Sequence, residues 1–297
     1  MQEFEVAVIG GGFAGLSAAL YAARAGAETV VLERAAPGGQ ILTAGHVENY
    51  PGGGVTDGAA LAEQLTGQVR AQGVRILGQE VTGISAGCLE TDGGQFGFRA
   101  LILATGAERR RLGVPGEDRF AGRGVSWCAA CDGFFFRGKT VAVVGGGNTA
   151  LEEAVELSAH CAQVYVLFRA EVPRADRVLA ERARHRANIR LLPGTVVREI
   201  CGEQSVTGLV IERDGAQTTL AVDGVFEAIG TVPNTAPVAS LLPRGADGGI
   251  VTDAACRTAV PGIFAAGDCR SGAVRQLVTA AADGAVAGML AAKHVGL

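Results

Sequence analysis

The chain has 297 residues, 48% of them hydrophobic, which suits one large domain or two domains of ordinary size in a soluble α/β protein. Its formal net charge of −4, with no basic stripe, argues against nucleic acid as the main partner. No apolar stretch reaches the roughly 18 residues of a membrane span, and the acidic segment Met1–Glu5 is not typical of a signal peptide.

The first elements in chain order form a βαβ unit. An apolar strand over 4–9 leads into the turn Gly10-Gly-Gly12-Phe-Ala-Gly15, an Ala-rich helix over about 14–25 and a buried strand over 29–32, closed by Glu33. The three glycines permit a tight turn, close approach of the backbone to a pyrophosphate, and close packing of helix on strand. Glu33 can accept both hydroxyl hydrogens of a ribose. The pattern predicts a dinucleotide site, and a plain glycine-rich turn is the alternative.

A pair of cysteines follows in the segment Ser126-Trp-Cys128-Ala-Ala-Cys131-Asp132. Residues three apart share a helix face, so a disulfide can close there. A second CxxC is missing, and His160 and His185 are not placed as zinc partners, so the spacing favours redox chemistry over a metal site. Asp132 can deliver or remove a proton beside a reacting thiol. Two buried structural cysteines remain the alternative.

The other cysteines are widely spread, and the total of seven is odd, so a secreted disulfide framework is not expected. We expect them to be small buried side chains in a cytoplasmic protein. They are Cys88, Cys161, Cys201, Cys256 and Cys269.

The βαβ pattern recurs 135 residues later. A strand over 140–144 precedes the turn Gly145-Gly-Gly147-Asn148-Thr149-Ala150, a helix over 150–158 and a strand over 163–167. The repeat predicts a second dinucleotide site.

The second copy lacks the acid of the first, because Phe168 stands where Glu33 would recur. Arg169 follows it, and Arg174 lies a few residues on. An acid would repel a 2′-phosphate and an arginine would pair with it, so this site tolerates NADPH better than an acid-bearing site does. A solvated surface is the alternative for these arginines, because the stretch 169–190 is Arg-rich throughout, as an exposed helix often is.

These motifs, in this order, resemble the low-molecular-weight thioredoxin reductases, a class of pyridine nucleotide-disulfide oxidoreductases, along nearly the whole chain. Further segments similar to that family are Gly38-Gly39-Gln40, Val47-Glu-Asn49-Tyr-Pro-Gly52, Ala104-Thr105-Gly106, Cys128–Arg137, and Gly262-Ile-Phe-Ala-Ala-Gly267-Asp268 with Arg275-Gln276.

The resemblance implies a role for each matching residue. Cys131 is expected to face the flavin, Cys128 to attack the partner disulfide, and Asp132 to manage protons, while Phe134 and Phe135 match the docking surface for thioredoxin. Expected FAD contacts are Gly10, Gly12, Gly15, Glu33, Gly39, Gln40, Asn49, Thr105, Gly106, Gly267, Asp268 on the ribityl chain, Arg275, and Gln276 near the isoalloxazine. Expected NAD(P)H contacts are Gly145, Gly147, Asn148, Thr149, Arg169 and Arg174.

The chain departs from the family at the 2′-phosphate site. Members that prefer NADPH carry His-Arg-Arg and then a spaced arginine, whereas this chain has Phe168-Arg169-Ala170 and then Arg174. The segment Arg174–Leu179 also resembles the NADH-linked alkyl hydroperoxide reductase flavoproteins. NADPH is expected, with NADH as an alternative.

The expected fold is α/β, with two Rossmann-like dinucleotide-binding domains, the second inserted in the first. Charged, Gly/Pro-marked stretches divide the chain into an FAD-binding domain over 1–111 and 237–297 and an NAD(P)H-binding domain over 112–236, which carries the CxxC. Because the dithiol and the nicotinamide turn share the inserted domain and must both reach one flavin, we expect that domain to rotate between two docked states.

The expected function is that of a thioredoxin reductase, which passes electrons from NAD(P)H through FAD and the Cys128–Cys131 dithiol to thioredoxin or a similar carrier. A homodimer without a metal is expected from the family. Three alternatives remain open: an NADH-linked reductase of a separate peroxiredoxin- or glutaredoxin-like carrier, a ferredoxin:NADP reductase, and a low-turnover flavin redox sensor.

Overall fold

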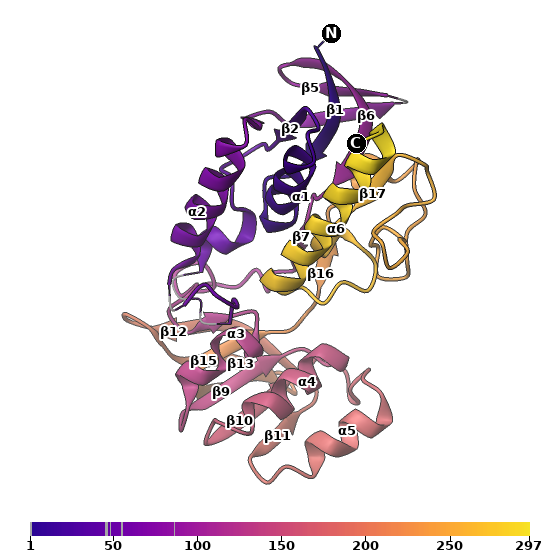
Figure 1. The fold of residues 1–297 in the computed structure, drawn as a ribbon. Coiled ribbons are helices and arrows are strands. Elements are labelled where there is room, and N and C mark those ends of the chain that lie inside the picture. The colour runs from indigo at the N-terminus through magenta and orange to yellow at the C-terminus, as the bar shows by residue number, and fades with distance from the viewer. Residues whose placement is uncertain (1, 45–46, 48, 55, 86) are drawn as a thin grey trace. The chain divides into compact units, whose positions relative to one another are not determined.

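The computed structural model describes residues 2–44, 47, 49–54, 56–85 and 87–297. The chain forms two compact units (Figure 1). Unit 1 comprises Met1–Glu108 and Val232–Leu297, and unit 2 comprises Arg109–Thr231. Short strands at the two crossings, β7 (Ala107–Arg109) and β16 (Thr231–Pro233), pair with each other. None of the described helices is long and apolar enough to cross a membrane.

Unit 1 is built on one sheet in the order β3-β2-β1-β6-β5-β4, and β17 also pairs with β6. The pairs β3–β2, β2–β1, β1–β6 and β6–β17 are parallel, whereas β4, β5 and β6 pair antiparallel. The bounds are β1 (Gln2–Ile9), β2 (Thr29–Leu32), β3 (Arg75–Leu77), β4 (Val81–Ser85), β5 (Cys88–Thr91), β6 (Gly94–Leu103) and β17 (Ile263–Ala265).

Small residues let two helices of unit 1 pack closely. A Cβ atom at Gly284 would lie 2.0 Å from the carbonyl oxygen of Ala14, and one at Gly288 would lie 2.3 Å from that of Ala18. The helices of unit 1 are α1 (Phe13–Arg24), α2 (Gly58–Ala71) and α6 (Leu277–Val295), with short 3₁₀ turns η1 (Gly39–Thr43), η3 (Ala236–Val238) and η4 (Gly267–Cys269).

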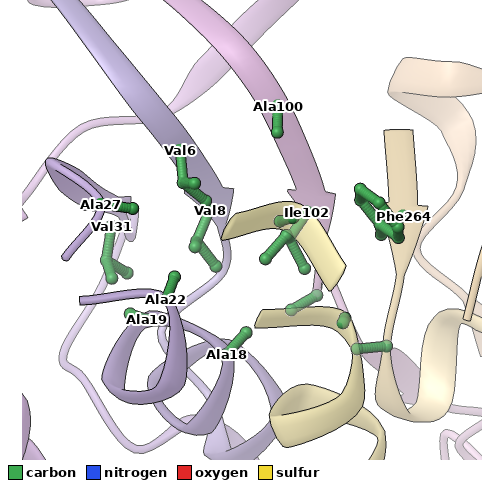
Figure 2. Close-up of a cluster of buried hydrophobic side chains, with 14 of the residues drawn as sticks. Val6, Val8, Ala18, Ala19, Ala22, Ala27, Val31, Ala100, Ile102 and Phe264 are labelled. Carbon is green, nitrogen blue, oxygen red and sulfur yellow. The ribbon is translucent and has the colours of Figure 1, made fainter. Parts of the chain in front are cut away.

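The core of unit 1 lies where these helices meet the parallel strands. Figure 2 shows side chains from β1, α1, β6 and β17 directed toward one another. The labelled residues are Val6, Val8, Ala18, Ala19, Ala22, Ala27, Val31, Ala100, Ile102 and Phe264. β-Branched side chains suit the strands, and alanines give a helix that is buried on nearly every side.

Unit 2 has a five-stranded parallel sheet in the order β11-β10-β9-β15-β8 and a separate antiparallel sheet, β12-β13-β14. Its strands are β8 (Val125–Ser126), β9 (Thr140–Val144), β10 (Gln163–Leu167), β11 (Ile189–Leu192), β12 (Thr195–Gly202), β13 (Val206–Arg213), β14 (Ala216–Ala221) and β15 (Gly224–Glu227). Its helices are α3 (Ala129–Asp132), α4 (Asn148–Leu157) and α5 (Arg177–Arg184), with the 3₁₀ turn η2 (Gly133–Phe136).

The strands predicted over 29–32, 140–144 and 163–167 are confirmed, and the α/β fold has the expected alternation of strand, glycine turn and helix. The helix predicted over 150–158 begins two residues earlier, because Gly147 caps it. The Arg-rich stretch 169–190 does not form one helix: α5 covers only Arg177–Arg184, and β11 begins at the buried Ile189.

Candidate active site

The first glycine turn joins β1 to α1 and packs against the end of β6. Gly10 has φ +101°, and a Cβ atom there would lie 2.3 Å from the carbonyl oxygen of Ala104. A Cβ atom at Gly15 would lie 1.8 Å from the carbonyl oxygen of Gly10. At Gly12, the N-cap of α1, a Cβ atom would meet nothing within 4 Å. The open corner at a helix N-terminus fits the pyrophosphate of a dinucleotide.

Glu33 is held beside this turn. One of its carboxylate oxygens accepts a hydrogen bond from the amide of Gly11 at 2.6 Å, and the other accepts from the amide of Ala35 at 2.8 Å. A carboxylate has about four acceptor positions, so lone pairs remain for hydroxyl donors. The structure therefore fixes the acid where a ribose bound along the turn can reach it.

The next expected flavin loop lies against the same turn. Gly39 has φ +67°, and a Cβ atom there would lie 3.1 Å from the Cα atom of Gly12. Gln40 donates from Nε2 to the carbonyl oxygen of Ala107 at 2.7 Å. The loop therefore connects the glycine turn to the segment that follows β6.

Long-range hydrogen bonds bring other expected flavin residues together. The backbone amide of Asn234 donates to the carbonyl oxygen of Gly106 at 2.9 Å, and the hydroxyl of Thr105 donates to the backbone carbonyl oxygen of Asn234 at 2.6 Å. Asn49 donates from Nδ2 to Oε1 of Gln276 at 3.3 Å, across 227 residues of sequence. Gln276 also caps α6.

The C-terminal flavin motif lies beside α1. A Cβ atom at Gly267 would lie 2.8 Å from the Cβ atom of Ala14, so glycine is needed for this contact. Asp268 follows in η4 and is half-buried, whereas Arg275 is exposed and has φ +59°. Glu48, inside the expected loop Val47–Gly52, lies outside the described residues.

The second glycine turn repeats the geometry of the first. Gly145 has φ +148°, and a Cβ atom there would lie 2.3 Å from the carbonyl oxygen of Ala228. Gly147 is the N-cap of α4, and a Cβ atom there would meet nothing within 4 Å. The exposed Asn148 exchanges hydrogen bonds of 2.9 and 2.8 Å with Asp176, and Thr149 is exposed beside it.

Phe168 takes the place beside the second turn that Glu33 takes beside the first. A Cβ atom at Gly146 would lie 3.0 Å from that of Phe168, whose side chain is 6% exposed within the core of unit 2. Arg174 donates from its amide to the carbonyl oxygen of Gly146 at 2.7 Å. Arg169 and Arg174 both have exposed side chains. This turn therefore offers positive charge and no carboxylate at the equivalent position.

The two cysteines form a disulfide, with their Cα atoms 5.3 Å apart. The expectation that both lie on one helix is wrong: Cys128 has φ −152° and ψ 104° and precedes α3 as its N-cap. Its sulfur accepts a hydrogen bond from the amide of Cys131 at 3.2 Å, which satisfies a donor at the start of the helix. Cys131 is the more exposed of the two residues.

Ser126, which the sequence did not single out, links Asp132 to the disulfide segment. Its hydroxyl donates to Oδ2 of Asp132 at 2.5 Å and accepts from the amide of Cys128 at 3.2 Å. The serine therefore fixes the carboxylate next to the cysteine backbone. Its place two residues before Cys128 is the signal that could have indicated it.

A buried acid, Glu153, lies on α4 under the disulfide segment. Its pKa is raised to about 7: burial is the main cause, the nearby amide of Ala129 opposes the rise, and the charge of Glu156 adds to it. Its Oε2 atom is buried and has no hydrogen-bond partner among the described residues. Sequence patterns could not show this acid, because it occupies an ordinary helix position.

Two aromatic side chains project after α3. Phe134 is 57% exposed and Phe135 is 42% exposed, and the guanidinium of Arg137 lies 5.0 Å from the ring centre of Phe134. Within the part of the chain that the structure describes, no three His, Cys, Asp or Glu side chains are grouped so that they could hold a metal ion.

A family model for pyridine nucleotide-disulphide oxidoreductases matches residues 4–284. The chain belongs to this family. It is therefore an oxidoreductase, and its two glycine turns correspond to the two Rossmann-like units of the family.

Curated relatives and solved structures agree over almost the whole chain. The thioredoxin reductase of Treponema pallidum (strain Nichols) is 42% identical and covers 99% of this chain and 97% of its own. That of Listeria monocytogenes is 40% identical, covering 98% and 94%. The crystal structure of thioredoxin reductase from Streptococcus pyogenes MGAS5005 is 38% identical, with a TM-score of 0.94 and 98% of each chain covered.

The family uses FAD and a pyridine nucleotide, and both glycine turns fit such groups. In each turn, the N-cap glycine has open space where a side chain would project. The first glycine of each turn packs closely against the carbonyl group at the end of a neighbouring strand. Glu33 supplies a ribose acceptor at the first turn only. The residues present therefore suit FAD at the first turn and a nicotinamide nucleotide at the second.

The open corner of the second turn can be tested with Gly147→Val. Gly147 has φ −92° and no neighbour within 4 Å of its Cβ position, so the variant should fold and keep its FAD. Its side chain would occupy the space of the pyrophosphate. We expect KM for NAD(P)H to rise at least about tenfold, equivalent to ~1.4 kcal/mol of binding.

The matched variant is Gly12→Val, whose Cβ position is equally open at the first turn. It should lose flavin absorbance at 450 nm, roughly where oxidised flavins absorb. If Gly147→Val binds NAD(P)H as well as the unaltered enzyme does, the second turn is not the nucleotide site.

Proposed function

We propose that this oxidoreductase is a thioredoxin reductase, which transfers two electrons from NAD(P)H through FAD and the Cys128–Cys131 pair to the disulfide of thioredoxin or a similar small carrier. The observation that carries the proposal is the disulfide in the same unit as the second glycine turn. The names of relatives at 40–42% identity over nearly the full chain support it.

The parallel sheet of unit 2 explains why the disulfide and the turn lie near one another. Strand β8 leads into Cys128, strand β9 leads into Gly145, and β15 lies between them. Because all three strands are parallel, their carboxyl ends meet at one edge of the sheet, where open α/β sheets bind ligands. This edge therefore presents both redox elements.

We assign the steps to the residues as follows. When bound, FAD supplies the two-electron step between nicotinamide and disulfide. Reduction breaks the Cys128–Cys131 bond with two electrons, and the sulfurs take up protons through Asp132, which Ser126 orients. Cys128 then attacks the disulfide of the carrier, and Cys131 attacks Cys128 in the mixed disulfide to release the reduced carrier. The exposed Phe134 and Phe135 are the proposed docking surface.

NADPH is the proposed physiological nucleotide. The side chains of Arg169 and Arg174 are exposed beside a turn that has a buried Phe168 instead of an acid. A 2′-phosphate can pair with either guanidinium, whereas nothing at this position selects the free 2′-hydroxyl of NADH.

Rotation of unit 2 is part of the proposal. The proposed FAD residues belong to residues 1–108 and 232–297, whereas the dithiol and the nicotinamide turn both belong to 109–231. One flavin ring cannot meet both at once. The inserted unit therefore alternates between two docked states about the two chain crossings.

A homodimer in the cytoplasm completes the proposal. Cys161, Cys201, Cys256 and Cys269 are free thiols, and a reducing compartment preserves such thiols. Sedimentation of the purified holoenzyme would measure its mass, and a monomer would contradict the dimer.

Cys128→Ser tests the proposed route of the electrons. NAD(P)H should still bleach the flavin, because both dinucleotide sites are unaltered. Reduction of thioredoxin should fall at least about a thousandfold, because the attacking sulfur is removed. Anaerobic stopped-flow absorbance and a coupled thioredoxin assay measure the two halves. The matched control is Cys201→Ser, a half-buried free cysteine on β12, which should leave both unchanged. Full thioredoxin reduction by Cys128→Ser would remove the dithiol from the mechanism.

Arg169→Ala and Arg174→Ala test the nucleotide preference. A charge-assisted hydrogen bond contributes about 1.5–3 kcal/mol, so each variant should raise KM for NADPH about 10- to 100-fold and leave KM for NADH unchanged. Arg184→Ala, an exposed arginine on α5, is the control. Equal effects on both nucleotides would show that these arginines do not read the 2′-phosphate.

A covalent crosslink between the two units tests the rotation. Steady-state reduction of thioredoxin should be lost, while one half-reaction, either flavin reduction by NADPH or dithiol–flavin exchange, should survive in single-turnover experiments. Normal steady-state turnover by the crosslinked enzyme would contradict the proposed rotation.

A further inference from the structure

A pair of buried acids lies in unit 2, one in a turn and one at the end of a strand of its parallel sheet. Glu117 is 2% exposed and Glu227 is 4% exposed. Glu227 ends β15, and the residue before it, Phe226, pairs with Ser126 of β8 and Val143 of β9. Glu227 therefore lies at the sheet edge described above, between the strand leading to Cys128 and the strand leading to Gly145.

One oxygen of Glu227 holds the residue that precedes Cys128. Nε1 of Trp127 donates to Oε2 of Glu227 at 2.9 Å, across 100 residues of sequence. On the chain after Trp127, Cys128 is bound to Ser126 through its amide and to Cys131 through its sulfur. The indole bond to Glu227 therefore restrains the backbone that carries Cys128.

A proton on Glu227 would explain why its other oxygen, Oε1, lies buried without a hydrogen-bond donor in the described part of the chain. Oε1 is buried and has no hydrogen-bond donor among the described residues, and the carboxyl group of Glu117 lies beside it. The oxygens of Glu117 accept from other donors, Arg111 Nε at 3.0 Å and the amide of Gly113 at 2.7 Å. A protonated Glu227 can donate to Glu117, and both acids are then satisfied.

The electrostatic surroundings favour this proton. The pKa of Glu227 is raised to about 8: burial is the main cause, the charge of Glu117 adds to the rise, and the bond from Trp127 and the charge of Arg111 oppose it. Two further charged groups lie near this cluster: Asp118 forms an ion pair with Arg111, and the guanidinium of Arg109 lies 4.9 Å from the ring centre of Trp127. Near neutral pH the pair therefore carries one negative charge and one proton.

We propose that Glu227 is a positioning residue for the dithiol: as a protonated acid shared with Glu117 it fixes Trp127 and through it Cys128, and its ionisation lowers the reactivity of the reduced Cys128. The inference deepens the proposed function, because it assigns a role within the same dithiol site. A second buried negative charge near Cys128 disfavours the thiolate, which is the reactive form of the sulfur.

The first experiment uses Trp127, the only tryptophan of the chain, as the reporter. Its fluorescence in the oxidised holoenzyme should change in one step between pH 6 and 10, with a midpoint near 8, as Glu227 loses its proton. Glu227→Gln keeps an acceptor for the indole and cannot ionise, so the step should vanish. Glu117→Gln should move the midpoint down by about one pH unit, because a charge that holds the proton is removed.

The second experiment measures Cys128 itself in a Cys131→Ser background. Iodoacetamide alkylates the thiolate, forming a carbon–sulfur bond and releasing iodide, and mass spectrometry of the Cys128 peptide gives the rate. Adding Glu227→Gln should leave the rate unchanged at pH 7 and raise it at least about threefold at pH 9, where the unaltered Glu227 is ionised.

Three results would overturn the inference. They are a flat fluorescence titration of the unaltered enzyme, a step that persists in Glu227→Gln, and equal alkylation rates at pH 9 with and without Glu227. If Glu227→Gln fails to fold, the shift of the midpoint in Glu117→Gln decides the question. None of these measurements uses thioredoxin or NAD(P)H, so a failure here is distinct from a failure of the proposed function.

Discussion

The close approach of two glycine turns to neighbouring strand ends is the constraint on which both dinucleotide sites depend. Gly10 lies against the carbonyl of Ala104, and Gly145 lies against that of Ala228, at distances that exclude any side chain. Each contact pins the inner side of the turn to the sheet and leaves the amides at the helix N-terminus facing open space. The chemistry at each turn then depends on what ends the following strand, Glu33 in one case and Phe168 in the other.

The order of strands in unit 2 turns this geometry into a redox site. With β15 between β8 and β9, the segments that follow these two strands, the CxxC and the second glycine turn, lie at one edge of the sheet. Ser126, the last residue of β8, donates a hydrogen bond to Asp132. Trp127, the next residue, donates one to Glu227. The sheet thus positions the sulfurs from two sides, whereas α3, a single turn, could not do so alone.

Local patterns were sufficient for the strands and glycine turns, because each depends on residues close in sequence. The disulfide was also predictable, because a separation of three residues brings two cysteines within bonding reach. The conformation of Cys128 was not, since an N-cap is extended while the spacing alone implies a helix. The bond between Trp127 and Glu227 was beyond sequence patterns too, because it depends on which strand lies between β8 and β9.

Glu227 and Glu153, whose pKa values are raised by burial, show that the fold keeps protonated acids near the disulfide at a cost in stability that grows with pH. The ordinary pKa of 4.5 for Glu227 rises to about 8 in the folded protein. Between these pH values the folded chain holds a proton that the unfolded chain has lost, so the free energy of unfolding falls as pH rises from about 4.5 to 8. Below that range the acid is neutral in both states and its contribution is constant. Glu153, with its pKa raised to about 7, follows the same rule over a narrower range. The proton that limits the cost of burial is thus the same proton that keeps a second charge away from the sulfurs.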